Sequence, residues 1–172
     1  MGSGWGRFGH GHEVKLNIGS GEVRFDGYLN VDVRDDCGAD IVADAGQIPL
    51  PSESIEHIKA HDIYEHVPKD QAALLLAEWW RLLIVGGTLE LRCPNLHALA
   101  VQLSYWHDKP SPQLNDLLNN IYGGHRFGPD GCWDQHHYGY SPTTLALNLE
   151  VAGFEVLSND EAINMTVIAV KR

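Results

Sequence analysis

Several signatures that would assign a protein to a functional class at once are missing from this sequence. Its 12 Lys and Arg residues stand against 23 Asp and Glu residues, a formal net charge of −11, and the cations form no stripe. Because affinity for a nucleic-acid backbone depends on clustered cations, this balance argues against a nucleic-acid partner. No apolar run approaches the roughly 20 residues of a membrane span, so we expect no membrane partner either.

Cysteine is scarce and unpatterned. The three cysteines, Cys37, Cys93 and Cys132, are odd in number and form no CxxC pair, which supports neither a disulfide framework nor a zinc ribbon. Residues 1–12, MGSGWGRFGHGH, lack the apolar core of a signal peptide. We therefore expect a flexible tail at 1–12, one domain at 13–172 and a cytoplasmic location.

Phosphate-binding motifs are absent as well, although residues 15–33, KLNIGSGEVRFDGYLNVDV, are typical of a nucleotide-binding α/β protein. A dinucleotide fingerprint needs Gly or Ala where Arg24 stands, and an acid about 20 residues on. Asp32 follows Gly21 by only eleven positions. A ligand without phosphates suits a site that has lost the helix whose N-terminus would bind one. A plain tight turn is the alternative reading of Gly19–Gly21.

The pattern of apolar residues predicts an α/β fold with a mostly parallel sheet. Strands are expected at 14–18, 28–33, 39–43, 54–60 and 88–93, and a closing pair at 154–158 and 163–170 adds one antiparallel strand. Helices are expected from about Pro68 to Val85 and from Ser141-Pro142 to Gly153. Such sheets bind ligands beyond the carboxyl ends of their strands, which places on one rim Gly19–Gly21, Asp32, Asp44, His61 and Pro94.

Aromatic residues divide into two groups. Helical patterns indicate that one group lies in the core, namely Trp79, Trp80, Tyr105 and Trp106. Between 95 and 140 two helical segments lead into a long polar-aromatic loop, and loops of that length are usually functional or disordered. The four aromatic residues between Phe127 and Tyr140 argue against disorder. Trp133 and Tyr138 are therefore expected to line a pocket.

Six segments together carry a family resemblance. In chain order they are LNIGSG, NVDV, ADAGQIPLP, SIEHIKAHDIYEHVP, LLAEWWRLLIVGGTLELRCPN and SPTTLALNLEVAGFEV. They resemble successive motifs of class I S-adenosylmethionine-dependent methyltransferases, most closely a compact branch of the small-molecule (type 11) group. The resemblance covers about residues 14–170, and 95–140 only loosely. It implies a Rossmann-like methyltransferase fold with a seven-stranded sheet, in which 95–140 is an insertion for the substrate and the lid.

The resemblance also implies a cofactor, S-adenosyl-L-methionine, and the residues that would bind it. Asn17, Gly19, Ser20 and Gly21 would face its methionine part. Asp32 would hold the ribose, Val33 would pack on the adenine, and Asp44 and Ala45 would bind the adenine edge. His61 would lie beside the methionine or the transferable methyl group, which makes it a catalytic candidate as well. A turn-capping role is the alternative for Asp44.

The chain also departs from the resembled pattern. Ser20 stands where the family usually has Cys or Thr, and Val85 where Pro usually precedes the glycine pair. The crossovers after the first and second strands are shortened, so the cofactor site should be more open than usual. Cover must then come from 95–140, from the tail or from a second subunit in a homodimer.

Histidines supply the candidate catalytic groups. A hydroxyl or protonated amine needs a base near neutral pH, for which imidazole is suited. In the resembled branch, a Tyr-Gly-Gly and a later histidine-containing loop belong to the substrate side, and 122–125 and 136–138 match loosely. We therefore select His136 or His137 as substrate contact or base, with packing among loop aromatics as the alternative. His66 is expected to cap or pack at the start of the long helix.

No metal is expected, although two alternative interpretations of the histidines would make them zinc ligands. DIYEH resembles the inverted zinc motif HxxEH, but Asp62 occupies the first histidine position and His61 is out of register. Zinc held by His125, His136 and Asp130 or Cys132 is the other alternative.

The sequence as a whole predicts methyl transfer to a small-molecule acceptor. The DPPY-type signature of enzymes that methylate nucleic-acid amino groups is absent, which agrees with the acidic composition. The rival interpretation is a non-catalytic cofactor-binding or protein-interaction module with a degenerate site. Residues 122–140 are predicted to form a lid that orders when ligands bind.

Overall fold

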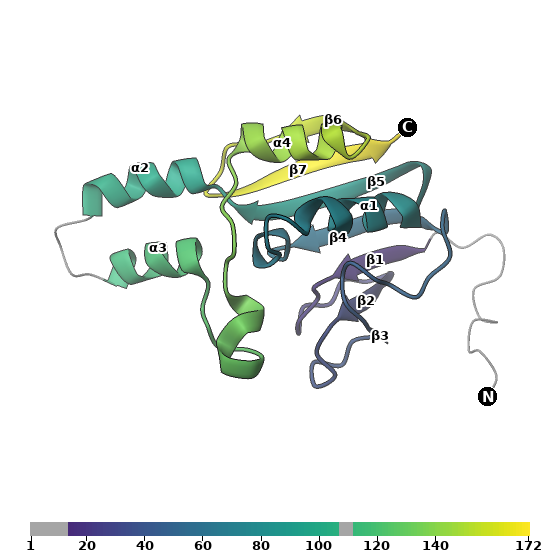
Figure 1. Cartoon of the computed structure of the whole chain (residues 1–172), viewed down its shortest axis with the longest axis horizontal. Coiled ribbons are helices and arrows are strands. Elements are labelled where there is room, and N and C mark those ends of the chain that lie inside the picture. The colour runs from purple at the N-terminus through teal and green to yellow at the C-terminus, as the bar shows by residue number, and fades with distance from the viewer. Residues whose placement is uncertain (1–13, 107–111) are drawn as a thin grey trace.

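Seven strands form a single sheet in the order β3-β2-β1-β4-β5-β7-β6 (Figure 1). The computed structural model describes residues 14–106 and 112–172. The strands are β1 (Lys15–Ile18), β2 (Tyr28–Asp32), β3 (Ile41–Val42), β4 (Ile55–His61), β5 (Leu83–Pro94), β6 (Phe154–Asn159) and β7 (Asn164–Lys171). β7 runs antiparallel to both β5 and β6, and the other pairings are parallel. The predicted α/β class, strand number and single antiparallel strand are confirmed.

Two helices cover one face of this sheet, α1 (Ala72–Leu82) and α4 (Pro142–Val151), whereas α2 (Leu96–Trp106) and α3 (Pro112–Tyr122) pair with each other beyond it (Figure 1). α4 begins at a capping box between Ser141 and Thr144, with Pro142 in its first turn. α1 directs Leu75, Leu76 and other apolar side chains into the core. Short 3-10 turns follow β4 at Tyr64–His66 and α3 at Pro129–Asp134.

The boundary between α1 and β5 differs from the prediction. The helix expected to continue to Val85 ends at Leu82, and β5 already begins at Leu83. Leu83 has extended backbone and pairs with Ile55, after which the register shifts. Leucine is apolar and buried in either element, so periodicity could not locate this boundary.

The first two crossovers are loops. Within the described residues no helix joins β1 to β2 or β2 to β3, as the short intervening sequences predicted. The face opposite α1 and α4 is accordingly polar, although parallel sheets are usually buried on both sides. Its half-buried side chains come from alternate positions of β4 and β5, and Glu90 joins the two strands through Lys59 Nζ at 3.1 Å and His61 Nε2 at 2.6 Å.

Some sequence-based expectations are corrected or fall outside the described residues. Tyr105, expected in the core, is 75% exposed because the outer half of α2 projects away from the sheet. Trp79 is fully buried as predicted. The tail at 1–12 and the side chain of Trp106 lie outside the described part of the chain.

None of the helices described is long and apolar enough to cross a membrane.

Candidate functional site

A cleft of about 1500 Å³ opens at the carboxyl ends of β1, β2 and β4. One wall comes from the first half of the chain, and the other from 119–136. The lining includes every residue predicted to bind the cofactor: Asn17, Gly19, Ser20, Gly21, Asp32, Val33, Asp44, Ala45 and His61. It also includes Pro94, so the rim expected from the strand ends is present.

The Gly-Ser-Gly turn is held closely against β2 and β4. Gly19 and Gly21 have φ angles of 67° and 50°, in the left-handed region that favours glycine. The amides of Gly19 and Ser20 donate to the carbonyl of Val31 at 2.9 and 3.1 Å. A Cβ on Gly19 would lie 2.5 Å from Cδ1 of Ile63. Both backbone conformation and packing therefore require glycine at position 19.

Asp32 connects this turn to the end of β2. Its Oδ2 accepts the amide of Gly21 at 2.7 Å, and its Oδ1 accepts the amide of Arg34 at 3.0 Å. The side chain is largely buried but still lines the cleft. Each carboxylate oxygen can accept more than one hydrogen bond, so a diol could bind without breaking these contacts.

Asn17 organises the loop that replaces the first helix. Its Nδ2 donates to the carbonyl of Val23 and to Oδ1 of Asn30, each at 3.0 Å. Both side-chain protons are therefore used within the protein. The side chain borders the cleft, and its contacts make it a support for the turn.

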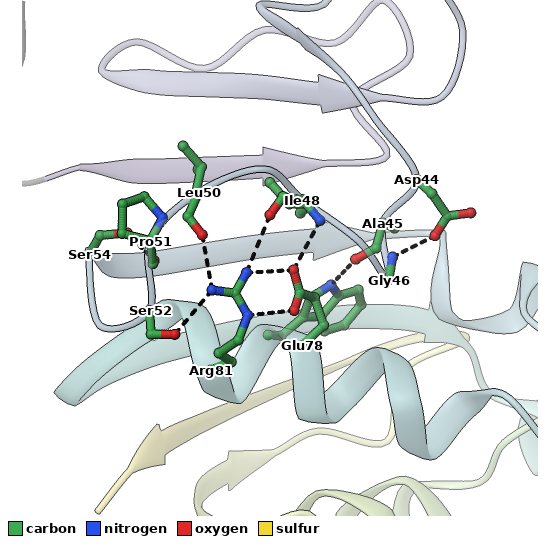
Figure 2. Close-up of polar contacts among 11 residues, drawn as sticks. Asp44, Ala45, Gly46, Ile48, Leu50, Pro51, Ser52, Ser54, Glu78 and Arg81 are labelled. Carbon is green, nitrogen blue, oxygen red and sulfur yellow. Dashed lines mark hydrogen bonds and ion pairs between the residues drawn. The ribbon is translucent and has the colours of Figure 1, made fainter. Parts of the chain in front are cut away.

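The segment after β3 is fixed to α1 although it contains no helix (Figure 2). Oδ1 of Asp44 accepts the amide of Gly46 at 2.7 Å, and the carbonyl of Ala45 accepts Nε1 of Trp79 at 3.0 Å. The turn-capping role of Asp44 is thus present, and its contact with adenine stays a prediction.

An ion pair continues this attachment away from the cleft. The guanidinium of Arg81 bonds both carboxylate oxygens of Glu78 at 2.7 Å and donates to the carbonyl of Leu50 at 2.9 Å (Figure 2). Oε1 of Glu78 accepts the amide of Ile48 at 2.9 Å. The hydrogen bond from Arg81 lowers the pKa of Glu78. This network holds the chain that leads from Asp44 towards β4.

His61 ends β4 at the cleft. Its Nε2 lies 2.6 Å from Oε1 of Glu90, and its ring meets Phe25 edge to face. Burial lowers the pKa of His61, and the hydrogen bond to Glu90 opposes that effect. Glu90 thereby fixes the imidazole at the position where the methionine end of the cofactor was predicted.

A second group of side chains lies where the two walls meet. Glu65 is buried, and its carboxylate is 4.0 Å from Nε2 of His136. The rings of His66 and His136 pack edge to face with centroids 4.8 Å apart. Burial raises the pKa of Glu65 to about 8, and burial together with His66 lowers the pKa of His136 to about 4. Sequence reasoning missed Glu65 and treated His66 as a packing residue.

The two histidines selected from the loop have different surroundings. His136 is half-buried and lines the cleft. His137 is exposed and does not line it, and its amide donates to the carbonyl of Glu65 at 2.8 Å. The structure therefore brings His136 to the site and leaves His137 with a backbone contact.

Residues 122–140 reach across the cleft towards the end of β2. Asp134 accepts the amides of Arg126 and Phe127 at 2.6 and 3.1 Å, which folds the loop on itself. The guanidinium of Arg34 lies 4.7 Å from the ring centre of Phe127. Because Arg34 also contacts Asp32, the loop stands directly beside the predicted ribose position.

The remaining loop candidates are only partly brought to the cleft. Trp133 lines it, whereas Tyr138 packs against Tyr140 and is not part of the lining. His125 contacts the carbonyl of Tyr122 at 3.0 Å. The side chains of Asp130 and Cys132, which complete the alternative zinc set, lie outside the described part of the chain. The other two cysteines are free.

Comparison with known proteins finds similarity to one class of enzyme. A family model described as a methyltransferase domain matches residues 16–91, which contain most of β1, all of β2 to β4 and α1, and most of β5. Among curated protein sequences there is no match.

Solved structures match over nearly the whole chain. A SAM-dependent methyltransferase from Methanosarcina mazei has a TM-score of 0.63 and 16% identity, covering 93% of both chains. A SAM-dependent methyltransferase from Archaeoglobus fulgidus has a TM-score of 0.63 and 16% identity, covering 94% of this chain and 87% of that one. A third structure is the 1,6-didemethyltoxoflavin-N1-methyltransferase of Burkholderia thailandensis, solved with 1,6-didemethyltoxoflavin and S-adenosylhomocysteine. Its TM-score is 0.61 and its identity 13%, covering 92% of this chain and 70% of that one. At these identities the likeness concerns the fold.

Proposed function

We propose that this chain is a class I S-adenosylmethionine-dependent methyltransferase and transfers the methyl group of its cofactor to a small-molecule acceptor. The observation that carries the proposal is the two-walled cleft. Its volume of about 1500 Å³ exceeds the ~300–1000 Å³ of a typical single-ligand pocket. The cleft therefore has room for the cofactor and a second molecule together.

The wall from the first half of the chain suits the cofactor. The left-handed turn at Gly19–Gly21 lets the backbone approach the methionine part without Cβ atoms in the way. We assign the ribose hydroxyls to Asp32, which is largely buried, negatively charged and fixed by the Gly21 amide. Val33, 47% exposed, offers an apolar surface to the adenine, and Asp44 with Ala45 borders its edge.

The wall from 119–136 suits the acceptor. Trp133 supplies an aromatic surface, and His136 places an imidazole between this wall and the strand ends. Methyl transfer is an in-line displacement, so the main task of this wall is to align the acceptor with the carbon–sulfur bond and to exclude water. A net charge of −11 gives no general attraction for polyanionic substrates, which favours a small molecule.

The acceptor class can be tested with methyl-labelled cofactor. The protein is incubated with a cell extract separated by ultrafiltration into small-molecule and macromolecular fractions. We expect label in the small-molecule fraction with the parent protein and much less with Asp32→Ala. Label confined to macromolecules would overturn the acceptor class. Cofactor binding without transfer to either fraction would support the non-catalytic alternative.

A further inference from the structure

Three metal-ligating side chains converge on the acceptor side of the cleft. They are the carboxylate of Glu65 and the imidazoles of His66 and His136. Each side chain offers one ligand atom, and the three atoms lie within 4.8 Å of one another. Atoms that each bind one ion at about 2.1 Å in tetrahedral geometry lie roughly 3.4 Å apart, so the three side chains would have to approach one another when the ion binds. All three residues also line the cleft, so an ion held between them would be reachable by a second molecule.

The carboxylate of Glu65 independently indicates a missing partner. Glu65 is 2% exposed, and neither of its oxygens has a hydrogen bond. A buried carboxylate without a partner is costly, because it must either bind a proton or find a cation. The guanidinium of Arg92 bonds Asp62 instead, at 3.2 Å from Nε to Oδ1.

Backbone contacts orient both imidazoles for ligation. Nδ1 of His66 lies 3.1 Å from the carbonyl of Gln135, and Nδ1 of His136 lies 3.1 Å from the carbonyl of Asn120. A carbonyl can only accept, so each Nδ1 carries the proton and each Nε2 keeps its lone pair. Metal-binding histidines are typically fixed in this way by a carbonyl or carboxylate behind the ring.

We propose that Glu65, His66 and His136 bind one divalent first-row transition-metal ion, with an open coordination position facing the cleft. Two imidazoles and one carboxylate suit Zn²⁺, Mn²⁺ or Fe²⁺ and leave positions for outside ligands. The site departs from the metal-free expectation drawn from sequence, and it shares only His136 with the alternative set that included His125.

The use of this ion rests on the proposed function, whereas its binding does not. An acceptor hydroxyl bound to the open position would become more acidic and release its proton to water. Its oxygen would then use a lone pair to form the new bond to the methyl carbon. The carbon–sulfur bond breaks as this bond forms, and sulfur keeps that electron pair. His136 would then act as a ligand and not as a base.

Titration with Co²⁺ tests the site directly. The full chain carries His10→Ala and His12→Ala in every sample, because tail imidazoles would bind metal independently. After chelator treatment, Co²⁺ is added without cofactor or acceptor and followed by visible absorption. We expect one equivalent to bind and Zn²⁺ to displace it. Glu65→Gln and His136→Gln should each weaken binding by at least about 100-fold, more than the effect typical of an outer-shell change.

His125→Ala is the matched control, since its imidazole is exposed and contacts only a backbone carbonyl in the described residues. It should leave Co²⁺ affinity unchanged. Circular dichroism and melting establish that each variant is folded, and His136→Gln carries the test if Glu65→Gln unfolds. Absence of stoichiometric binding, or unchanged affinity in folded His136→Gln, would overturn the proposal. Loss of binding only in His125→Ala would overturn it too. None of these results depends on methyl transfer.

Discussion

The amide of Gly21 donates a 2.7 Å hydrogen bond to the carboxylate of Asp32. Gly21 belongs to the loop after β1 and Asp32 is the last residue of β2, and this bond closes the turn over the strand ends. The same carboxylate is the proposed partner of the cofactor ribose. Asp32 would thus both shape the turn and bind the ligand.

Asp32→Ala should weaken binding of S-adenosylhomocysteine by about 1–3 kcal/mol, the cost of losing hydrogen bonds to a charged group. Calorimetry measures the change, and Asp36→Ala, at an exposed position in the loop that follows β2, is the control that should bind normally. Unchanged affinity in folded Asp32→Ala would remove the residue from the ribose site.

Gly19→Ala should destabilise the fold more than Gly27→Ala. Both glycines have positive φ, 67° and 81°, but a Cβ on Gly27 meets nothing within 4 Å. Gly27→Ala therefore reports backbone strain of about 1–2 kcal/mol. Gly19→Ala adds the clash with Ile63, about 1–3 kcal/mol for overpacking. Urea unfolding measures both, and Ile63→Ala introduced into Gly19→Ala should recover part of the difference. Equal effects of the two single changes would contradict the packing argument.

Stability should depend on pH through Glu78. The hydrogen bond from Arg81 lowers the pKa of Glu78 below its ordinary 4.5, so this contribution is fully present above pH 4.5. It is lost as pH falls through the lower folded pKa. Glu78→Gln should reduce the free energy of unfolding by about 1–3 kcal/mol at pH 7 and by clearly less at pH 3.

The control for this titration is Glu150→Gln on α4, whose side chain is exposed and whose effect should stay within about 0.5 kcal/mol. A Glu78→Gln penalty that is equally large at pH 3 would show that the charge of Glu78 does not stabilise the segment after Asp44.

Residues 122–140 should become more protected when cofactor binds. Phe127 of this loop already contacts Arg34, which belongs to the wall proposed to bind the cofactor. This contact lies at the same end of the strands as Gly19. Hydrogen exchange with S-adenosylhomocysteine should slow across 122–140, while amides of α4 serve as an internal reference. Equal protection with and without ligand would argue against a lid.

The sequence predicted which residues meet on the wall from the first half of the chain, because its signals are local. Carboxyl ends of parallel strands meet at one edge, so locating each strand was enough to bring Gly19, Asp32, Asp44 and His61 together. The acceptor wall could not be predicted in the same way. The surroundings of Glu65 are created by residues some 70 positions later, including the amides of His137 and Tyr138 that bond its carbonyl.

Choosing between His136 and His137 was equally beyond the sequence. Adjacent residues in an extended segment point in different directions, and only the fold decides which one meets the cleft. The sequence signal for Glu65 was its position, a carboxylate followed by histidine four residues after the end of a strand. The same pattern is also common at the start of a helix, where acids are favoured.

Calorimetric titration of the full chain with S-adenosylhomocysteine tests the central claim most directly. A class I methyltransferase whose cleft binds the cofactor should show saturable binding of one molecule per chain. Affinity should fall in Asp32→Ala and persist in Asp36→Ala. Absence of binding at millimolar ligand by a folded protein would contradict the account.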